Sequence, residues 1–204
     1  MSTTDLTSRP RKGQLTRLRI LEAAASVLER DGYAAATLTE IASVAQMQAG
    51  SLYYHFDSKD AIVEEVLRVG VEHSREAICV AVGSMGPEAS GHDRLIAAVT
   101  AYVQVIVAES NFTRANIRCF EEAPLSARKS LAVPLRDFAN LWVDLLVGGQ
   151  RDGSIRTDLE ARVIARMTIA ALNSCVQWYR PDGELSIEQV ASMFATSLVD
   201  GLAA

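Results

Sequence analysis

The chain has 204 residues, of which 49% are hydrophobic and 22% charged, and its formal net charge is −5. Its apolar runs stay well short of the ~20 residues that a membrane span needs, and its polar, basic first residues are unlike a signal peptide. We therefore expect a cytoplasmic protein without membrane contact. Cys79, Cys119 and Cys175 lie far apart without ligand-spaced partners, which argues against disulfides and a metal site.

The positive charge gathers at one end of the chain. Residues 1–20 carry five basic residues against Asp5 alone, whereas residues 61–204 carry 13 Lys and Arg against 18 Asp and Glu. This distribution suits a protein that contacts nucleic acid at its first end only. Residues 1–12 are predicted to be a flexible basic arm. Its Arg9, Arg11 and Lys12 either follow a DNA backbone or merely keep the chain soluble.

A first helix is predicted at about residues 13–30, where Leu18, Leu21 and Leu28 recur at helical spacing, and Asp31-Gly32 is expected to end it. Two short helices follow within residues 37–59. Thr37 and Glu40 have the spacing of a reciprocal capping box at the start of the first. The segment 46–48 is too short and polar to continue its apolar face, and is therefore predicted to be the connection.

The second short helix is expected to point Leu52 and Phe56 inward and to end in aromatic residues. The side chains left on its outer side are hydrogen-bonding groups without a carboxylate, which suits base edges and phosphate oxygens. The alternative is an ordinary helical hairpin with half-buried tyrosines. With the helix cap and the following lysine, the candidate DNA-binding residues are Thr37, Gln48, Ala49, Ser51, Tyr53, Tyr54, His55 and Lys59.

The rest of the chain is predicted to be helical, without strands or repeats. A long helix capped by Ser58 runs to about residue 82 and joins the first part of the chain to the second. Pro134 is expected to kink a later helix. The segment 158–179 is apolar nearly all round and must be covered on more than one side. Further helices are predicted at about 92–109, 112–122, 126–150, 158–179 and 186–202.

The order Thr37, Glu40-Ile41-Ala42, Gly50-Ser51-Leu52-Tyr53-Tyr54-His55-Phe56 and Ser58-Lys59-Asp60 resembles the helix-turn-helix signature of the tetracycline-repressor (TetR) family. With the preceding helix, the resemblance covers roughly residues 14–62. It implies an all-α fold, in which a three-helix DNA-binding head at 13–60 is joined to a larger helical body at 61–204 for ligand binding and dimerisation. It also implies that the second short helix enters the major groove and that the Tyr, His and Lys near its end hold phosphates.

The sequence departs from the family pattern at the turn, where Ala45-Gln46-Met47-Gln48 replaces the usual Ala-Gly-Val-Ser. Gln46 stands where a glycine tolerates positive φ, at a cost of about 1 kcal/mol. Gln48 replaces a short capping side chain, whose loss costs about 0.5–2 kcal/mol. The departure concerns the operator sequence rather than the fold.

This resemblance implies a regulator that binds a near-palindromic double-stranded operator as a homodimer. We expect it to be a repressor that a small, largely apolar effector releases from the operator. The last two helices are the candidate dimer interface, with a fully intramolecular core as the alternative. No cofactor is expected. A helical adaptor for protein partners would explain the helices but not the tyrosine-rich face, and an enzyme is disfavoured because no histidine has a catalytic partner.

The effector is expected within the body. Large apolar groups mixed with a few polar ones are typical of ligand cavities, although each such residue also fits an ordinary core. Arg118 and Arg166 either bind an anionic effector or pair with Glu121, Glu122 or other acids. The segment 177–183, QWYRPDG, resembles TetR regulators of lipid or steroid catabolism that respond to acyl-CoA thioesters. The candidate set is Tyr102, Phe112, Asn116, Arg118, Cys119, Phe120, Phe138, Trp142, Arg166, Met167, Ala171, Cys175 and Trp178.

Overall fold

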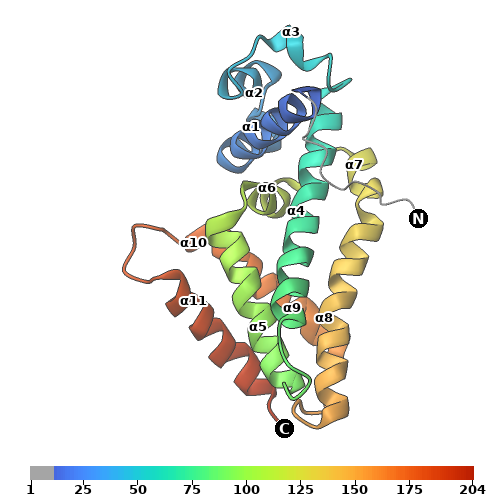
Figure 1. Cartoon of the computed structure of the whole chain (residues 1–204), viewed down its shortest axis with the longest axis vertical. Coiled ribbons are helices and arrows are strands. Elements are labelled where there is room, and N and C mark those ends of the chain that lie inside the picture. The colour runs from blue at the N-terminus through green and yellow to red at the C-terminus, as the bar shows by residue number, and fades with distance from the viewer. Residues whose placement is uncertain (1–11) are drawn as a thin grey trace, which may run out of the picture.

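The structure of the chain, a computed structural model, describes residues 12–204 apart from the side chain of Glu109. The described part is helical, with one isolated bridge between Ile155 and Ala203, and this confirms the predicted all-α class. Figure 1 shows three helices at one end of the molecule and a long helix, α4, that runs from them through the body. These elements are α1 (Lys12–Ala35), α2 (Leu38–Val44), α3 (Ala49–Leu52) and α4 (Lys59–Gly83).

The body surrounds the later turns of α4. Two of its helices, α5 and α11, continue into π-helical turns, which are named η1 and η2. The body consists of α5 (Gly91–Gln104), η1 (Val105–Glu109), α6 (Asn111–Cys119), α7 (Leu125–Ser130), α8 (Ala132–Asp152), α9 (Ala161–Asn173), α10 (Cys175–Trp178), α11 (Ile187–Phe194), η2 (Ala195–Val199) and the 3-10 turn η3 (Asp200–Leu202). No single described helix is long and apolar enough to cross a membrane. Only α5 with η1 and α6, which meet at 90°, reach that length and composition as a pair.

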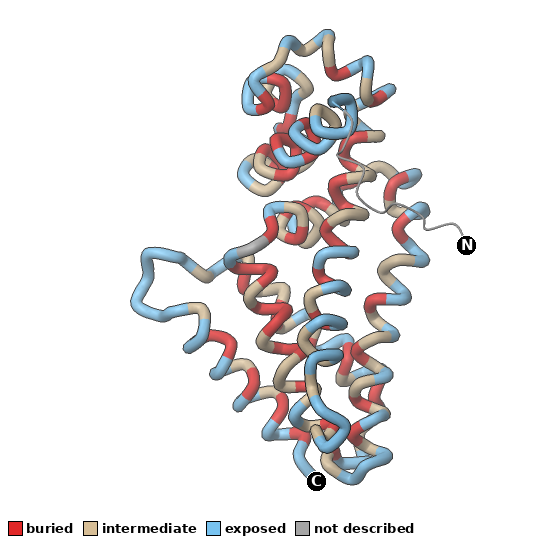
Figure 2. Tube along the Cα trace, viewed as in Figure 1, coloured by how far each residue is buried: buried red, intermediate tan, exposed pale blue. Residues whose placement is uncertain are grey.

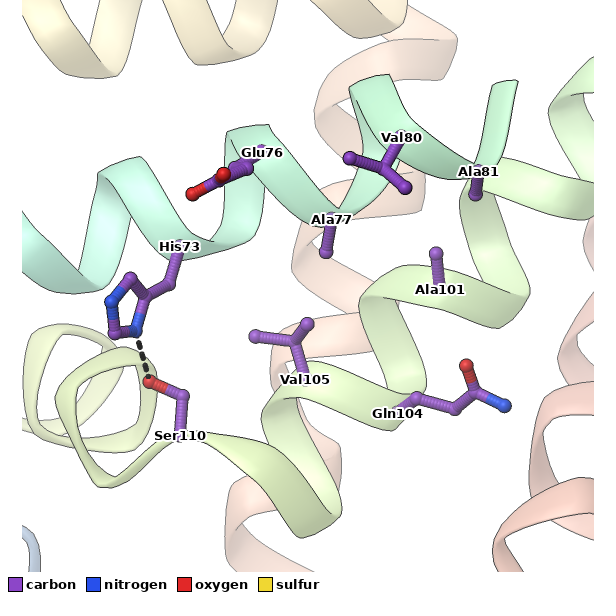
Figure 3. A pocket seen from close by; sticks show the side chains of 9 residues that line it. All are labelled: His73, Glu76, Ala77, Val80, Ala81, Ala101, Gln104, Val105 and Ser110. Atoms are coloured by element: carbon purple, nitrogen blue, oxygen red, sulfur yellow. Dashed lines mark hydrogen bonds between the residues drawn. The ribbon is translucent and has the colours of Figure 1, made fainter. Parts of the chain in front are cut away.

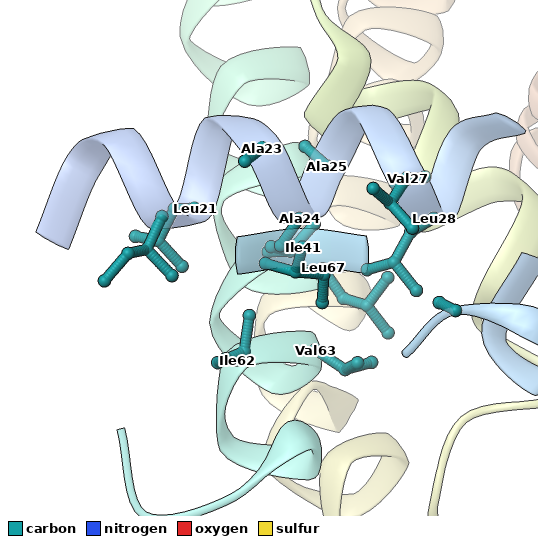
Figure 4. Packing of buried hydrophobic residues seen from close by; sticks show 14 of the residues in the cluster. Leu21, Ala23, Ala24, Ala25, Val27, Leu28, Ile41, Ile62, Val63 and Leu67 are labelled. Atoms are coloured by element: carbon teal, nitrogen blue, oxygen red, sulfur yellow. The ribbon is translucent and has the colours of Figure 1, made fainter. Parts of the chain in front are cut away.

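The core of the head is not built from the head alone. Leu28 of α1, Ile41 of α2 and Leu67 of α4 are completely buried against one another (Figure 4). Ala115 and Cys119 of α6 belong to the same cluster and are equally buried. Because α6 completes this core and α4 passes residue 60 without a break, the head and body are joined by packing as well as by the chain. The division at residue 60 stays a prediction.

The body has a second core, centred on three aromatic rings. Tyr102, Phe138 and Trp142 meet with ring centroids 5.3–6.4 Å apart, a spacing typical of favourable edge-to-face pairs. The Tyr102 hydroxyl donates to Asn173 Oδ1 at 2.7 Å. Burial raises the pKa of Tyr102 well above its ordinary value. This core therefore ties α5, α8 and α9 together.

The predicted helix over 126–150 is two helices. They meet at Leu131, which ends α7 and begins α8. Pro134 lies in the first turn of α8, where its missing N–H needs no helical acceptor. The predicted kink in the early part of this segment is therefore a break, which lies one turn before Pro134. The first helix is interrupted at Gly32, whose φ is 81°, as Asp31-Gly32 predicted, and a further helical turn beyond it ends at Ala35.

The predicted helix over 158–179 is shorter and is also divided. It begins at Ala161, because the Glu160 carboxylate accepts from Val163 N at 2.9 Å, and a second short helix starts after Ser174. Ala165 and Leu172 on one side are buried, whereas Met167 on the other is 61% exposed. The sequence predicts that other residues cover α9 on more than one side, but in the described part of the chain the side that carries Met167 stays exposed.

The turn between α2 and α3 contains a strained residue, as the sequence predicts. Gln46 has a φ of 55°, a conformation that costs a residue with a Cβ roughly 1–2 kcal/mol. Gln48 precedes α3 in extended conformation and makes no side-chain capping bond, which confirms the predicted loss of the cap. Both departures from the family pattern thus weaken the local structure.

We predict that Gln46→Gly raises the free energy of unfolding by about 0.5–1 kcal/mol, because glycine adopts positive φ freely but loses more entropy on folding. The melting temperature should rise by about 1–4 °C. Ser43→Gly is the matched control, since Ser43 is exposed within α2, and it should lower stability by about 0.5–1 kcal/mol. Equal losses in both variants would contradict strain at Gln46.

Candidate nucleic-acid interface and ligand cavities

The start of α2 is held by one half of the predicted capping box. The Thr37 hydroxyl accepts from Glu40 N at 3.1 Å. The Glu40 carboxylate does not return to the Thr37 amide. It accepts instead from Arg30 Nη2 of α1 at 2.9 Å, so the reciprocal bond predicted for Glu40 is wrong. This ion pair fixes α2 against α1 and leaves the exposed Thr37 at the edge of the head.

The short helix α3 is anchored from below. Leu52 and Phe56 are buried as predicted, but α3 ends at Leu52, and the aromatic residues lie in the following turn rather than in the helix. Tyr54 is 90% exposed and Tyr53 59%. Both rings are therefore open to solvent, as the predicted contact with DNA requires. Gln48 is exposed, whereas Ala49, Ser51 and His55 are half-buried.

The cations near this surface are partly engaged within the head. Lys59 Nζ donates to Tyr33 O at 2.6 Å and lies 4.3 Å from the centre of the Tyr33 ring. Arg17 pairs with Glu65 and lies 4.2 Å over the Phe56 ring. Lys12 is exposed at the start of α1, while Arg9 and Arg11 lie outside the described residues. One of the three Lys59 N–H groups is thus used by the Tyr33 carbonyl, which fixes the position of the ammonium group within the head.

A cavity of about 510 Å³ lies between α4 and α5, and we call it the α4–α5 cavity. Figure 3 shows Ala77, Ala101 and Val105 forming its apolar walls, with His73 hydrogen-bonded to Ser110 at one end. The His73 Nδ1 to Ser110 Oγ distance is 3.0 Å. The full lining is His73, Glu76, Ala77, Val80, Ala81, Ala101, Gln104, Val105 and Ser110.

Behind Ser110, a buried polar network connects this cavity to α6. The Ser110 hydroxyl accepts from Thr113 N at 3.2 Å and so caps α6. The Thr113 and Ser74 hydroxyls both donate to Gly70 O, at 3.1 and 2.8 Å. A group that binds His73 or Ser110 therefore acts on bonds that hold α6 to α4.

A second cavity, of about 290 Å³, lies beside the head, and we call it the α6–α10 cavity. It is lined by Glu29, Ile106, Val107, Arg114, Cys175, Val176, Tyr179, Arg180 and Pro181. Burial raises the pKa of its Cys175 thiol to about 11, so this group stays uncharged at neutral pH. The cavity contains part of the QWYRPDG segment singled out in the sequence.

The structure does not bring the predicted ligand-binding residues into one cavity. Tyr102, Phe138 and Trp142 fill the body core, and Cys175 alone of the set lines the α6–α10 cavity. Phe112, Cys119 and Phe120 pack on the head core, and Asn116 Nδ2 donates to Leu67 O at 3.0 Å. Arg166, Met167 and Trp178 are exposed and Ala171 is half-buried. Their role in ligand binding stays a prediction.

The two arginines proposed for an anionic effector lie outside both cavities. Arg118 is exposed and its Nη1 donates to Glu29 O at 2.9 Å, so it contacts α1 rather than Glu121 or Glu122. His73, Ser110, Arg114 and Arg180 were not among the residues predicted from the sequence. One feature of the sequence does indicate the contact between α4 and α6: Gly70 within an apolar helix is typical of the close approach of another backbone. A Cβ at position 70 would lie 2.3 Å from Phe112 O.

The last helices expose an apolar face. Met167, Trp178 and Met193 are 61%, 47% and 53% exposed, and Figure 2 shows buried and exposed residues alternating along α11. A groove of about 250 Å³ on this face is lined by Trp178, Val190, Met193, Phe194, Ser197 and Leu198. Such a face is typical of a subunit interface, in agreement with the predicted homodimer.

Comparison with known proteins agrees with this geometry. Residues 20–66 match the family model of bacterial regulatory proteins of the tetR family, and residues 88–202 match that of the tetracyclin repressor-like C-terminal domain. The HTH-type transcriptional repressor KstR2 of Rhodococcus jostii (strain RHA1) is 30% identical over 194 residues, which are 92% of this chain and 91% of that protein.

Solved structures share the fold. The ketosteroid transcriptional regulator KstR2 of Mycobacterium tuberculosis is 27% identical, with a TM-score of 0.77 over 92% of this chain and 95% of that one. AibR, solved in complex with isovaleryl coenzyme A and operator DNA, has a TM-score of 0.81 and 21% identity over 90% of this chain and 98% of that one.

The exposed helix-turn-helix and the helical body define a DNA-binding transcriptional regulator. The chain belongs to the TetR family.

We predict that head mutations divide by role. Tyr54→Phe and His55→Ala should weaken binding to all DNA alike, because phosphates carry no sequence information. Gln48→Ala and Ser51→Ala should change base preference, since a good base contact contributes roughly 1–3 kcal/mol of discrimination. Binding to specific and random duplexes, measured by fluorescence anisotropy, separates the two groups. Equal losses on both duplexes in all four variants would contradict this division.

Proposed function

We propose that this protein is a cytoplasmic, homodimeric repressor whose operator affinity falls when a small, largely apolar effector enters the α4–α5 cavity. The observation that carries the proposal is the shared wall: α4 lines this cavity and also begins beneath the DNA-binding head. A ligand that moves α4 against α5 changes the position of the head, and in a dimer it changes the spacing of two heads.

The cavity chemistry supports a slender apolar ligand with a polar end. Ala77, Ala81 and Ala101 provide small apolar walls, and Gln104, His73 and Ser110 offer hydrogen-bonding groups at the ends. An acyl chain with a polar thioester or carbonyl group fits this pattern. KstR2 is described as a ketosteroid regulator and AibR binds isovaleryl coenzyme A, which supports a lipid-derived or acyl-CoA effector here.

Release depends on differential affinity. An effector shifts the equilibrium only as far as it prefers the DNA-incompetent spacing, and a thousandfold release needs about 4 kcal/mol of that preference. The wall of the α4–α5 cavity offers a means, because Ser110 both faces the ligand space and caps α6. An effector that takes the hydrogen bond of His73 therefore removes a bond between α4 and the N-cap of α6, the helix that completes the head core.

The DNA part of this proposal predicts a footprint of two related half-sites. Two heads on one face of a duplex require half-site centres about 34–36 Å apart, or a multiple of that. DNase footprinting on the promoter regions next to the gene, with gel shifts at two salt concentrations, measures the spacing and the phosphate contribution. A monomer bound to a single asymmetric half-site would exclude the dimeric repressor.

The effector part predicts that a larger side chain in the α4–α5 cavity abolishes release by the effector but leaves operator binding intact. Ala77→Leu should retain operator binding but lose at least about tenfold of the release by acyl-CoA thioesters, because the added atoms occupy the ligand space. Cys79→Leu is the matched control, since Cys79 is exposed on the same helix and outside the lining. Operator affinity with and without octanoyl-coenzyme A measures the effect. Normal release from Ala77→Leu would place the effector elsewhere.

A further inference from the structure

The α6–α10 cavity differs from the α4–α5 cavity in its charges. The α4–α5 cavity has Glu76 as its charged residue beside His73, whereas the α6–α10 cavity is lined by Arg114 and Arg180 with Glu29 as the single carboxylate. Its other walls are largely apolar, formed by Ile106, Val107, Val176 and Pro181 among others. Two guanidinium groups next to an apolar surface suit an amphiphilic anion.

Arg114 is held in place by the turn that precedes it. Its Nη1 donates to Ile106 O and Val107 O, both at 3.2 Å, and its Nη2 bonds to Asn111 Oδ1. The Arg114 side chain is only 20% exposed, and its Nε lies 3.6 Å from Glu29 Oε1. This distance is longer than a hydrogen bond, so the ion pair with Glu29 is loose. A ligand oxygen can approach Arg114 more closely than Glu29 does.

Arg180 provides the second cation. Its Nη1 donates to Tyr179 O at 3.0 Å and Gln177 O at 3.4 Å, bonds that hold the side chain over the end of α10. In the described part of the chain, no carboxylate lies within ion-pair distance of Arg180. With Glu29 paired to Arg114, one positive charge of the lining is left for a ligand.

Glu29 connects this cavity to the head. It lies on α1, and two arginines one helical turn apart on α6 hold it: Arg118 bonds its carbonyl oxygen at 2.9 Å and Arg114 faces its carboxylate. An anion that binds Arg114 competes with the Glu29 carboxylate and removes one of these two links. The site is therefore placed where its occupancy changes how α6 holds α1.

We propose that the α6–α10 cavity binds the acidic group of an amphiphilic anion, a carboxylate or a phosphate, through Arg114 and Arg180 in competition with Glu29. The link to operator release rests on the proposed repressor function. The binding itself does not, because it is a property of the free protein. This assigns the anion to Arg114 and Arg180 rather than to Arg118 or Arg166.

The test is calorimetric titration of the DNA-free, full-length protein with octanoate, octanoyl-coenzyme A and octanol. Arg114→Met should weaken binding of the anionic probes by about 10- to 100-fold, the usual value of a hydrogen bond to a charged group. Arg118→Met is the matched control on the same face of α6, and it should bind as the wild type does. Octanoate binding identifies a carboxylate site, and binding of octanoyl-coenzyme A alone identifies a phosphate site.

Glu29→Gln separates competition from a structural effect, because the variant keeps the size of the side chain. It should bind the anion about two- to fivefold more tightly than the wild type, since the internal competitor is gone. The same anion should then change operator affinity less than in the wild type. Glu22→Gln, an exposed neighbour on α1, should change neither quantity.

Three results would overturn the proposal: a loss of octanol binding in Arg114→Met as large as the loss of anion binding, unchanged anion binding in Arg114→Met, or unchanged anion affinity in Glu29→Gln. Each is read without DNA, so such a result leaves the repressor function standing. Conversely, a protein that binds the anion through Arg114 but never binds an operator would contradict the proposed function and leave this site intact.

Discussion

The crossing of α4 over α6 at Gly70 is the constraint on which the rest of the structure depends. Only a residue without a side chain permits it, because a Cβ at position 70 would lie 2.3 Å from Phe112 O. The carbonyl of Gly70 then accepts from both Ser74 and Thr113, so the close approach of the backbones is fixed by buried hydrogen bonds. With α4 and α6 locked here, Ala115 and Cys119 reach the core beneath α1. The head therefore rests on α6, and its orientation follows from how α6 is held.

This arrangement explains why a regulator can respond to ligands that do not touch DNA. The head makes its own surface, with Tyr54 exposed and Leu52 buried beneath it, but it lacks a complete core without α6. In the proposed function, a change at the N-cap of α6, where Ser110 holds Thr113, moves α6 as a rigid body, because packed interiors do not deform continuously. Glu29, Arg114 and Arg118 form a second set of links across the same junction. In the proposed function, α6 is the single element that both the head and the ligand sites bias.

The sequence predicted what is local and missed what is tertiary. The Thr37 cap and the inward Leu52 and Phe56 follow from short-range rules, and the positive φ at Gln46 follows from the family pattern. The structure confirms all of them. The spacing of apolar residues also predicted a helical body, which the structure confirms as a fold class. The ligand-binding set was chosen by residue type, and large apolar residues such as Trp142 and Cys119 serve the two cores instead. Arg114 could not be found this way, because its importance comes from Glu29, 85 positions earlier in the sequence.

The two cavities share one turn of the chain, which lies just before α6. The π-helical turn Val105–Glu109 places Val105 in the wall of the α4–α5 cavity, and Ile106 and Val107 in the wall of the α6–α10 cavity. A π-turn interrupts the regular ladder of a helix and is frequent at functional sites, since it re-aims neighbouring side chains in different directions. Here it ends at Ser110, the cap of α6, while its carbonyls hold Arg114. In the proposed function, an occupant of one cavity contacts this turn at Val105, and an occupant of the other contacts it at Ile106 and Val107. Any coupling between two such occupants must be reciprocal, because both act through one shared equilibrium.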